Sequence, residues 1–246
     1  MIKRVAAIFV ALAIPIAFLE TPAEAQQLQW LNAITTSDQV VVVTATHRSA
    51  TVGTLRAYQR VNGQWDLIQS PAAVFLGRSG LVPGVARVQS SGTTPMGTFD
   101  LLTAFGRKTN PGTQMPYTRV DHNDAWTYNP KVPSTYNVFQ SVDRTWATYG
   151  KYVEHLWQLG PQYDYVITTS FNQPPGPITQ GHDGVNRATS HANIHRGGGI
   201  FLHVSKGIPT AGCVSMQRNV MRALLQWLEP SAHPVVVIGL AKDFNS

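Results

Sequence analysis

The chain has 246 residues and a formal net charge of +6, and 43% of its residues are hydrophobic against 13% charged. This is the composition of an ordinary globular protein, and no repeat, low-complexity tract or Pro/Ser-rich linker divides it. The positive charge suits an anionic wall or membrane surface. It is not gathered into the basic block typical of a nucleic-acid-binding tail, so nucleic acid is not an expected partner.

The first 25 residues have the pattern of a secretory signal peptide. A basic start, "MIKR", precedes the apolar run "VAAIFVALAIPIAFL", and Ala23 to Ala25 form a small-x-small cleavage site. The run is too short and too close to that site to indicate a stable membrane span after cleavage, with a retained anchor as the alternative. We therefore expect an exported protein in the periplasm, at the cell wall or outside the cell.

Residues 26–45 are interpreted as an N-terminal extension that leads into the first strand, and residues 46–246 as one domain. The pair Asn62-Gly63 is a strong hairpin signal. Apolar and β-branched content predicts strands over several segments, which are Gln39–Thr46, Gly53–Val61, Gly97–Gly106, Tyr163–Phe171, Gly199–Val204 and His233–Leu240.

Helices are fewer than strands in this interpretation. Apolar residues recur on one face from Gln217 to Glu229, and Pro230 ends that helix. A second helix is predicted near Arg144–Gln158. Many strands with few helices predict a mainly β fold, as a sandwich or a mixed barrel.

Cys213 is the one cysteine of the sequence. It has no partner for an internal disulfide, and an odd thiol in an exported chain indicates intermolecular pairing or a reactive residue. The alternative is a small buried hydrophobic residue.

The order of elements around Cys213 favours a reactive thiol. His203 lies near the end of a predicted strand, and a turn separates it from Cys213, which precedes the helix predicted from Gln217. The unpaired N–H groups and the dipole of a helix N-terminus are expected to lower the thiol pKa. The backbone at Gly212 and Cys213 is a candidate oxyanion hole, and His203 is a candidate general base.

These segments resemble the L,D-transpeptidase catalytic domain, also called the YkuD domain. The likeness is carried by "IFLHV" and "PTAGCVSM", and upstream in the same order by "GRSGL", "GTTPMGTFDLLTAFG", "MPY", "STYN" and "VEHLW". It spans Gly77 to Gly239. The resemblance implies a YkuD-like β fold.

By the same resemblance, Cys213 matches the nucleophile of the family and His203 the histidine that activates it. The implied reaction is attack on a stem-peptide carbonyl of peptidoglycan, followed by transfer of the thioester acyl group to an amine of a second stem. The resemblance implies no metal and no organic cofactor. It also implies that carbapenems acylate the same thiol.

The sequence departs from the commoner family pattern at two positions. Many members have His directly before Gly-Cys and Arg or Asn two places after Cys, where this chain has Ala211 and Ser215. Two other functions stay open: a cysteine peptidase or amidase that passes the thioester to water, and a non-catalytic module that binds the cell wall. Thr210 and Ser215, which flank the Gly-Cys pair, are candidate substrate contacts.

Histidines before the catalytic strand raise the question of a metal. His191 and His195 are four residues apart, with His182 and Asp183 nearby, but no Glu lies between them and "RGGG" would break a helix. We therefore predict no metal site. His195 and Arg196 are instead predicted to bind an acidic stem peptide, on position and charge.

Other polar and aromatic groups point to structural roles. Asp121, Asp124 and Asp164 do not form the close carboxylate pair of a glycosidase. Trp126, Tyr128 and Tyr136 lie in an Asn/Pro-rich segment, where aromatic rings either line a groove or anchor the loop to the core.

Overall fold

The computed structural model describes residues 30–143 and 146–244. The predicted signal peptide, residues 1–25, lies outside the described residues. The strands are β1 Gln39–Ala45, β2 Val52–Val61, β3 Gln64–Phe75, β4 Leu81–Pro83, β5 Thr94–Gly106, β6 Tyr117–Arg119, β7 Asp124–Thr127, β8 Val138–Ser141, β9 Val153–His155, β10 Val166–Thr169, β11 Ile178–Gln180, β12 Asn186–Ala188, β13 Phe201–Val204, β14 Val214–Met216 and β15 Val235–Leu240.

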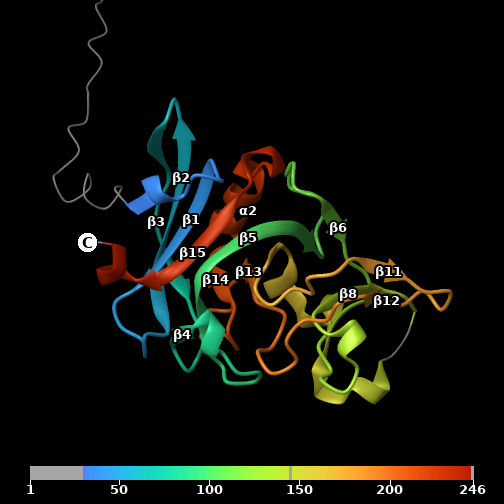
Figure 1. Ribbon diagram of the computed structural model, residues 1–246. Helices are drawn as coiled ribbons and strands as arrows, with labels where there is room; N and C mark the ends of the chain where they lie inside the picture. The colour runs from blue at the N-terminus through green and yellow to red at the C-terminus, as the bar shows by residue number, and fades with distance from the viewer. Residues whose placement is uncertain (1–29, 144–145, 245–246) are drawn as a thin grey trace, which may run out of the picture.

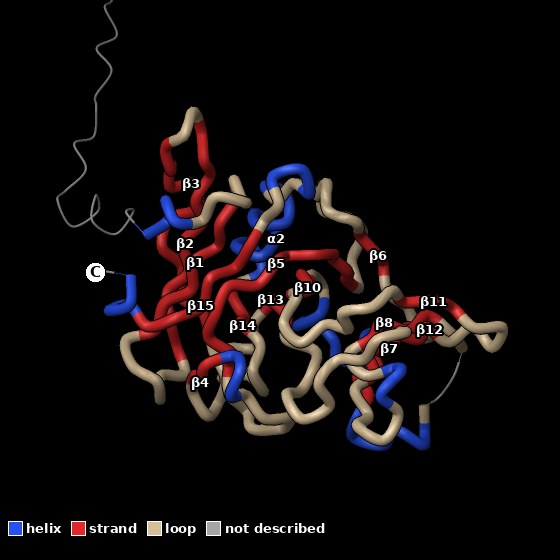
Figure 2. Tube along the Cα trace, viewed as in Figure 1, coloured by secondary structure: helices blue, strands red, loops and turns tan. Residues whose placement is uncertain are grey.

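One α-helix occurs among the residues that the structure describes (Figures 1 and 2). The α-helix is α2, Arg218–Trp227, close to the range predicted from the sequence. The remaining helices are 3-10 turns: η1 Trp30–Ala33, η2 Gly84–Ala86, η3 Pro133–Thr135, η4 Ala147–Tyr152, η5 Leu156–Tyr163, η6 Pro230–Ala232 and η7 Ala241–Phe244. No helix within residues 30–143 and 146–244 is both long and apolar enough to cross a bilayer.

Eight strands of the main sheet close into a ring. Their order is β10-β13-β14-β3-β2-β1-β15-β5, and β5 also pairs with β10, which joins the two ends. The β1–β15 and β13–β14 pairs are parallel, and the other pairs of the ring are antiparallel. The predicted mainly β fold is therefore confirmed, with the ring closed as a mixed barrel.

The ring forms because each of its strands buries apolar side chains inside it. All eight strands contribute to one core with α2, whose Met221, Leu224 and Leu225 are buried. Strand β1 is buried along its whole length, because Val41 and Val43 face this core. Its other face is covered by η1, η7 and the aromatic rings Tyr58 and Trp65.

The N-terminal boundary of the domain follows from β1. This strand pairs with β2 on one side and β15 on the other, whereas the sequence predicts an extension up to residue 45. We propose that the extension ends before Gln39. The hairpin after β2 turns at Asn62 and Gly63, both with positive φ (51° and 82°), as the sequence signal indicated.

A smaller layer packs on the outside of β10 and β13. It contains the three-stranded sheet β8-β7-β9 and the hairpin β11–β12, on the side away from β1 to β3 in Figure 1. Phe105, Trp126, Val166 and Phe201 belong to the core between this layer and the ring. Trp126 and Phe201 pack edge to face in this core, with their ring centres 4.8 Å apart.

The prediction of a helix near Arg144–Gln158 is wrong. The described part of this range holds η4, then β9, then the start of η5. Gly150 has a positive φ of 54°, and Gly160, within η5, has 73°, so the chain cannot continue as one α-helix. The break lets β9 pair with β7 and turns Glu154 toward the ring.

Candidate functional site

His203 lies in β13, and Cys213 lies next to the parallel strand β14. The register of the two strands pairs Leu202 with Val214 and His203 with Ser215, and Cys213 immediately precedes β14. The predicted placement of Cys213 at a helix N-terminus is wrong, because β14 separates it from α2. The thiol instead lies at the outer face of the ring, against the core shared with the smaller layer.

Backbone groups of the neighbouring strand hold the thiol of Cys213. The N–H of Phe201 donates to Sγ at 3.4 Å, and the thiol donates to the carbonyl of Gly199 at 3.2 Å. Burial raises the pKa of Cys213 to about 12, and the charge of Glu154 acts in the same direction. The Phe201 N–H and the charge of Arg87 favour the thiolate but do not outweigh burial. The predicted lowering of the thiol pKa is therefore wrong for the free protein.

His203 is 6% exposed, and its Nδ1 lies 2.8 Å from the carbonyl of Val204. A carbonyl only accepts, so Nδ1 carries the proton and Nε2 keeps its lone pair. Burial lowers the pKa of His203 to about 4, while hydrogen bonding to the backbone of Val204 and Gln162 acts in the opposite direction. A neutral imidazole has one unprotonated ring nitrogen and can act as a general base.

Two cavities meet at Cys213. The first, of about 250 Å³, holds His203 and Ser215 on its wall together with Cys213. The second, of about 120 Å³, lies toward Arg87 and the glycine-rich segment 197–199. Cys213, Glu154 and Ala211 line both, so a chain lying across the site would pass over the thiol.

Arg87 is a site residue that the sequence did not single out. It is 5% exposed, its Nε donates to the carbonyl of Thr93 at 2.8 Å, and its Nη1 donates to the carbonyl of Arg196 at 2.7 Å. Within the described residues it forms no ion pair with a carboxylate. Its charge therefore acts on Cys213 and favours negative charge there.

Glu154 is the second such residue. It belongs to the segment "VEHLW", whose sequence indicates no role for it, and it lines both cavities. Its Oε2 accepts a hydrogen bond of 2.6 Å from the hydroxyl of Tyr163, whose ring packs edge to face against His203. The pairing of β9 with β7, far from the Cys213 loop in sequence, brings Glu154 to the thiol.

The turn before Cys213 is built by Thr210. Its hydroxyl donates to the carbonyl of Cys213 at 2.6 Å and accepts from the N–H of Gly212 at 3.0 Å. The Gly212 N–H is thus already bonded, which leaves the N–H of Cys213 as the candidate oxyanion donor. Gly212 has a φ of 143°, and a Cβ there would come within 2.8 Å of Nη2 of Arg87. Thr210 shapes the turn in addition to lining the first cavity.

The other predicted substrate contacts divide into two groups. Ser215 is 1% exposed, lies in the first cavity, and its hydroxyl has no partner among the described residues. His195 and Arg196 line neither cavity. The Arg196 guanidinium donates to the carbonyl of Gly84 and packs over Phe171. The contribution of Arg196 to the site is its backbone carbonyl, which accepts a hydrogen bond from Arg87.

Neither a metal site nor the carboxylate pair of a glycosidase forms among the described residues. No group of three metal-ligating side chains occurs in residues 30–143 and 146–244, and His191 and His195 are exposed. Asp124 accepts from the N–H of Asp121, and Asp164 pairs with Arg107 and Arg218.

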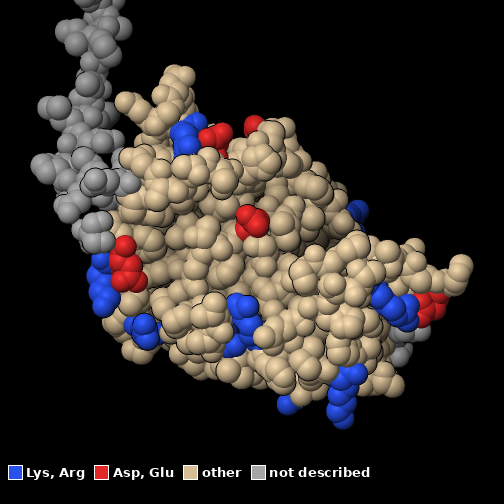
Figure 3. Space-filling view, in the orientation of Figure 1, with Lys and Arg blue, Asp and Glu red and all other residues tan. Residues whose placement is uncertain are grey.

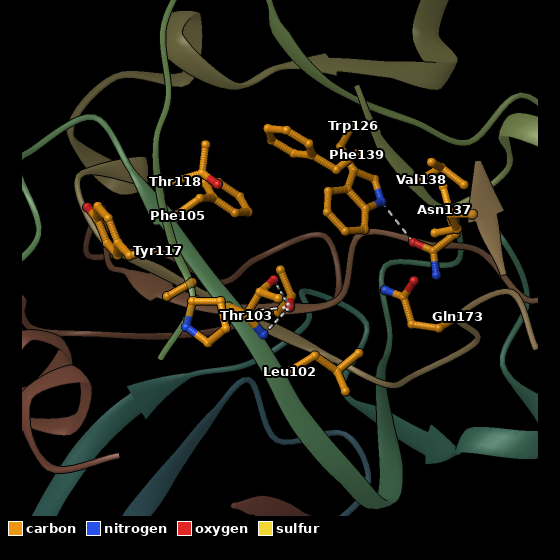
Figure 4. A pocket seen from close by; sticks show the side chains of 14 residues that line it. Leu102, Thr103, Phe105, Tyr117, Thr118, Trp126, Asn137, Val138, Phe139 and Gln173 are labelled. Atoms are coloured by element: carbon orange, nitrogen blue, oxygen red, sulfur yellow. Dashed lines mark hydrogen bonds between the residues drawn. The ribbon is translucent and has the colours of Figure 1, made fainter. Parts of the chain in front are cut away.

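The predicted aromatic segment is mostly anchored to the core. Trp126 donates to Asn137 at 2.8 Å, and Tyr136 is fully buried, whereas Tyr128 lines the second cavity. Trp126 also contributes to a larger cavity of about 430 Å³ beside β5, β6 and β8 (Figure 4). Figure 4 shows Phe105 and Phe139 on one side of it and Leu102 and Gln173 on the other, and its walls include no Cys, His, Asp or Glu.

Charged side chains are scattered over the face seen in Figure 3. Lys and Arg stand singly or beside Asp and Glu on this face, and they form no continuous basic stripe.

Comparison with known proteins gives one family and a distant structural likeness. Residues 37–237 match the YkuD family, described as the L,D-transpeptidase catalytic domain. A solved structure of a mutant of the helical cell shape determining protein Pgp2 from Campylobacter jejuni is similar at 16% identity and a TM-score of 0.35. The likeness covers 87% of this chain and 56% of that one. Comparison with curated proteins gave no match. With most of its length matched and a Cys, His and Gly turn at the point where its two cavities meet, the chain belongs to the YkuD family of L,D-transpeptidase catalytic domains.

Proposed function

We propose that the protein is an exported peptidoglycan L,D-transpeptidase in which Cys213 is the nucleophile and His203 the general base. The observation that carries the proposal is that β13 and β14 bring both side chains into one cavity, with the thiol reachable from two sides. A Cys with a neutral His within one site is the arrangement that acyl transfer requires. The Cys213 N–H and Arg87 supply positive potential for the oxyanion.

The reaction proceeds in two steps. His203 Nε2 takes the proton of the Cys213 thiol as sulfur attacks a stem-peptide carbonyl, and it returns that proton to the leaving amine of the terminal residue. The thioester carbon is then attacked by the amine of a second stem, which restores the free thiol. No metal or organic cofactor takes part in either step.

The test is mass spectrometry of the mature protein with disaccharide tetrapeptide stems. Cys213→Ala and Cys213→Ser are run in parallel, and Ser retains a hydroxyl of similar size at the same place. We expect a thioester adduct and a cross-linked dimer of stems with the wild type, and neither with the variants. A carbapenem is expected to add its mass to the wild type and not to Cys213→Ala.

Two other outcomes would change the assignment. Shortened stems without cross-links would make the protein a cysteine peptidase or amidase. An intact protein that yields no product requiring Cys213, yet is retained by purified sacculi, would be a wall-binding module. The raised pKa of the Cys213 thiol is the observation that favours this second candidate.

A further inference from the structure

Glu154 occupies a position that the two-residue scheme of Cys213 and His203 does not use. It is the charged side chain shared by the two cavities, whereas Arg87 lines the second and His203 the first. One carboxylate oxygen accepts from Tyr163. The other, Oε1, lies on the side of Gly199, where a Cβ would be 3.8 Å away. This oxygen accepts no hydrogen bond from any residue that the structure describes.

Glu154 forms no ion pair with any residue that the structure describes, although Lys206 lines the first cavity and Arg87 the second. Tyr163 is its hydrogen-bond donor. The titratable groups that line its two cavities are Tyr163, His203, Lys206 and Cys213 in the first, and Arg87, Tyr128 and Cys213 in the second. A half-buried carboxylate without a direct ion-pair partner is stabilised when a positive group arrives to join it.

The same carboxylate hinders the first step of the proposed reaction. Its charge disfavours the thiolate of Cys213. The opposite holds for the second step, in which the attacking nitrogen arrives as an ammonium ion and must lose a proton before it can attack. A carboxylate between the two cavities is suited to bind that ammonium and accept its proton.

We propose that Glu154 is the acceptor-side base, which binds the ammonium group of the incoming primary amine beside Cys213 and deprotonates it. This assignment rests on the proposed function. One proton passes from the ammonium to the carboxylate, the freed nitrogen lone pair bonds to the thioester carbon, and the carbon–sulfur bond breaks. The second nitrogen proton passes through His203 to the departing sulfur, which regenerates the thiol.

This role predicts that Glu154 governs the choice between amine and water. Water carries no positive charge, so the carboxylate offers it no comparable binding. The thioester between Cys213 and the acyl donor forms before Glu154 acts. Loss of the Glu154 charge therefore does not prevent thioester formation. Glu154→Gln is therefore expected to form the adduct and to hydrolyse it, while transfer to the amine falls about a hundredfold.

The experiment measures transferred and hydrolysed product from one stem donor across a range of acceptor-amine concentrations. Glu229→Gln is the matched control, because Glu229 is also partly exposed and its carboxylate accepts from one side chain, Gln114, away from both cavities. The control is expected to keep the wild-type ratio of transfer to hydrolysis. An unchanged ratio in Glu154→Gln would overturn the proposal.

A second variant tests the same role without removing the carboxylate. The hydroxyl of Tyr163 lowers the pKa of Glu154 against the raising effect of burial. Tyr163→Phe removes that hydrogen bond. The acidic limb of the pH profile for amine transfer is therefore expected to move to higher pH, while the acidic limb of the pH profile for hydrolysis stays where it is. If the pH profile of transfer in Tyr163→Phe does not move, Glu154 is not the acceptor-side base, and this result holds even if Glu154→Gln fails to fold.

Failure of this inference is distinguishable from failure of the proposed function. If wild-type protein yields no product requiring Cys213, the transpeptidase assignment itself fails. If wild-type protein transfers acyl groups and Glu154→Gln transfers them equally well, only the role of Glu154 fails.

Discussion

At the scale of single residues, Cys213 and His203 form a neutral pair in the free protein. Burial raises the thiol pKa to about 12 and lowers the imidazole pKa to about 4, so at pH 7 neither is charged. Activation therefore has to be coupled to attack, with His203 taking the proton as the sulfur approaches the carbonyl. Arg87 and Glu154 adjust this balance in opposite directions.

The first prediction concerns alkylation of the thiol by iodoacetamide. Because the thiolate is the reactive form, Cys213 is expected to react at least about tenfold more slowly than free cysteine at pH 7, and faster as pH rises toward 12. Removing the positive charge in Arg87→Met is expected to slow the reaction further. Removing the negative charge in Glu154→Gln is expected to accelerate it.

The control for these rates is Glu229→Gln, a change of the same chemical kind remote from the thiol. Its rate should equal that of the wild type. Rates that move in the same direction for Arg87→Met and Glu154→Gln would mean that loosened packing, and not charge, sets the reactivity.

At the scale of elements, the loop between β13 and β14 positions the nucleophile. Thr210 pairs with Gly77 across a bridge and bonds both Gly212 and Cys213, so the end of the loop is held at several points. Gly212 and Arg87 pack so closely that the turn and the buried guanidinium depend on each other.

The second prediction compares two glycines of this loop. Gly207 and Gly212 both have positive φ, 81° and 143°, so Ala is strained at each by about 1 kcal/mol. Only at Gly212 would the Cβ meet Arg87 and the carbonyl of Thr93, both at 2.8 Å, whereas Gly207 has open space. Gly212→Ala is expected to lower the rate of thioester formation at least about tenfold, and Gly207→Ala to leave it near wild type.

The measurement is the rate of thioester formation by mass spectrometry, with the melting temperature of each variant recorded. Equal effects of the two substitutions on acylation would contradict the idea that the position of Arg87 matters to the chemistry.

At the scale of the whole molecule, the closed ring makes the site part of the main core. Strands β13 and β14 carry Leu202, Val214 and Met216 into the interior shared with β1 and α2, while His203 and Cys213 face outward. Stability of the ring and charge at the site are therefore linked, since unfolding exposes His203 to water.

The third prediction follows from that linkage. The pKa of His203 is about 4 when folded and 6.5 when exposed, so between these values the unfolded chain binds a proton that the folded protein does not. The contribution of buried, neutral His203 to the free energy of unfolding is fully present above pH 6.5 and is lost as pH falls toward 4. Wild type is expected to lose about 3 kcal/mol more than His203→Gln over this range.

Denaturant unfolding at a series of pH values measures the difference. The comparison with His203→Gln is needed because the raised pKa of Glu154 acts in the opposite direction over part of the range and is common to both proteins. Parallel stability curves for wild type and variant would show that His203 is not buried as a neutral group.

The sequence by itself determined the local elements and the two reacting side chains. Apolar and β-branched content indicated β1, β5 and β15, the Asn62-Gly63 pair indicated the first hairpin, and apolar periodicity indicated α2. These signals are local, since each depends on residues within a few positions of one another. The single Cys213 and His203, ten residues earlier, were likewise predicted as the reacting pair from a short stretch of sequence.

Tertiary structure decided what surrounds that pair. The short strand β14 exists because it pairs with β13 and β3, and its formation removes Cys213 from the helix N-terminus that the sequence favoured. Arg87 and Glu154 reach the thiol through chain segments 126 and 59 residues away, a proximity that no local pattern encodes. The pKa of the thiol likewise depends on burial, which arises only when the ring and the smaller layer close around it.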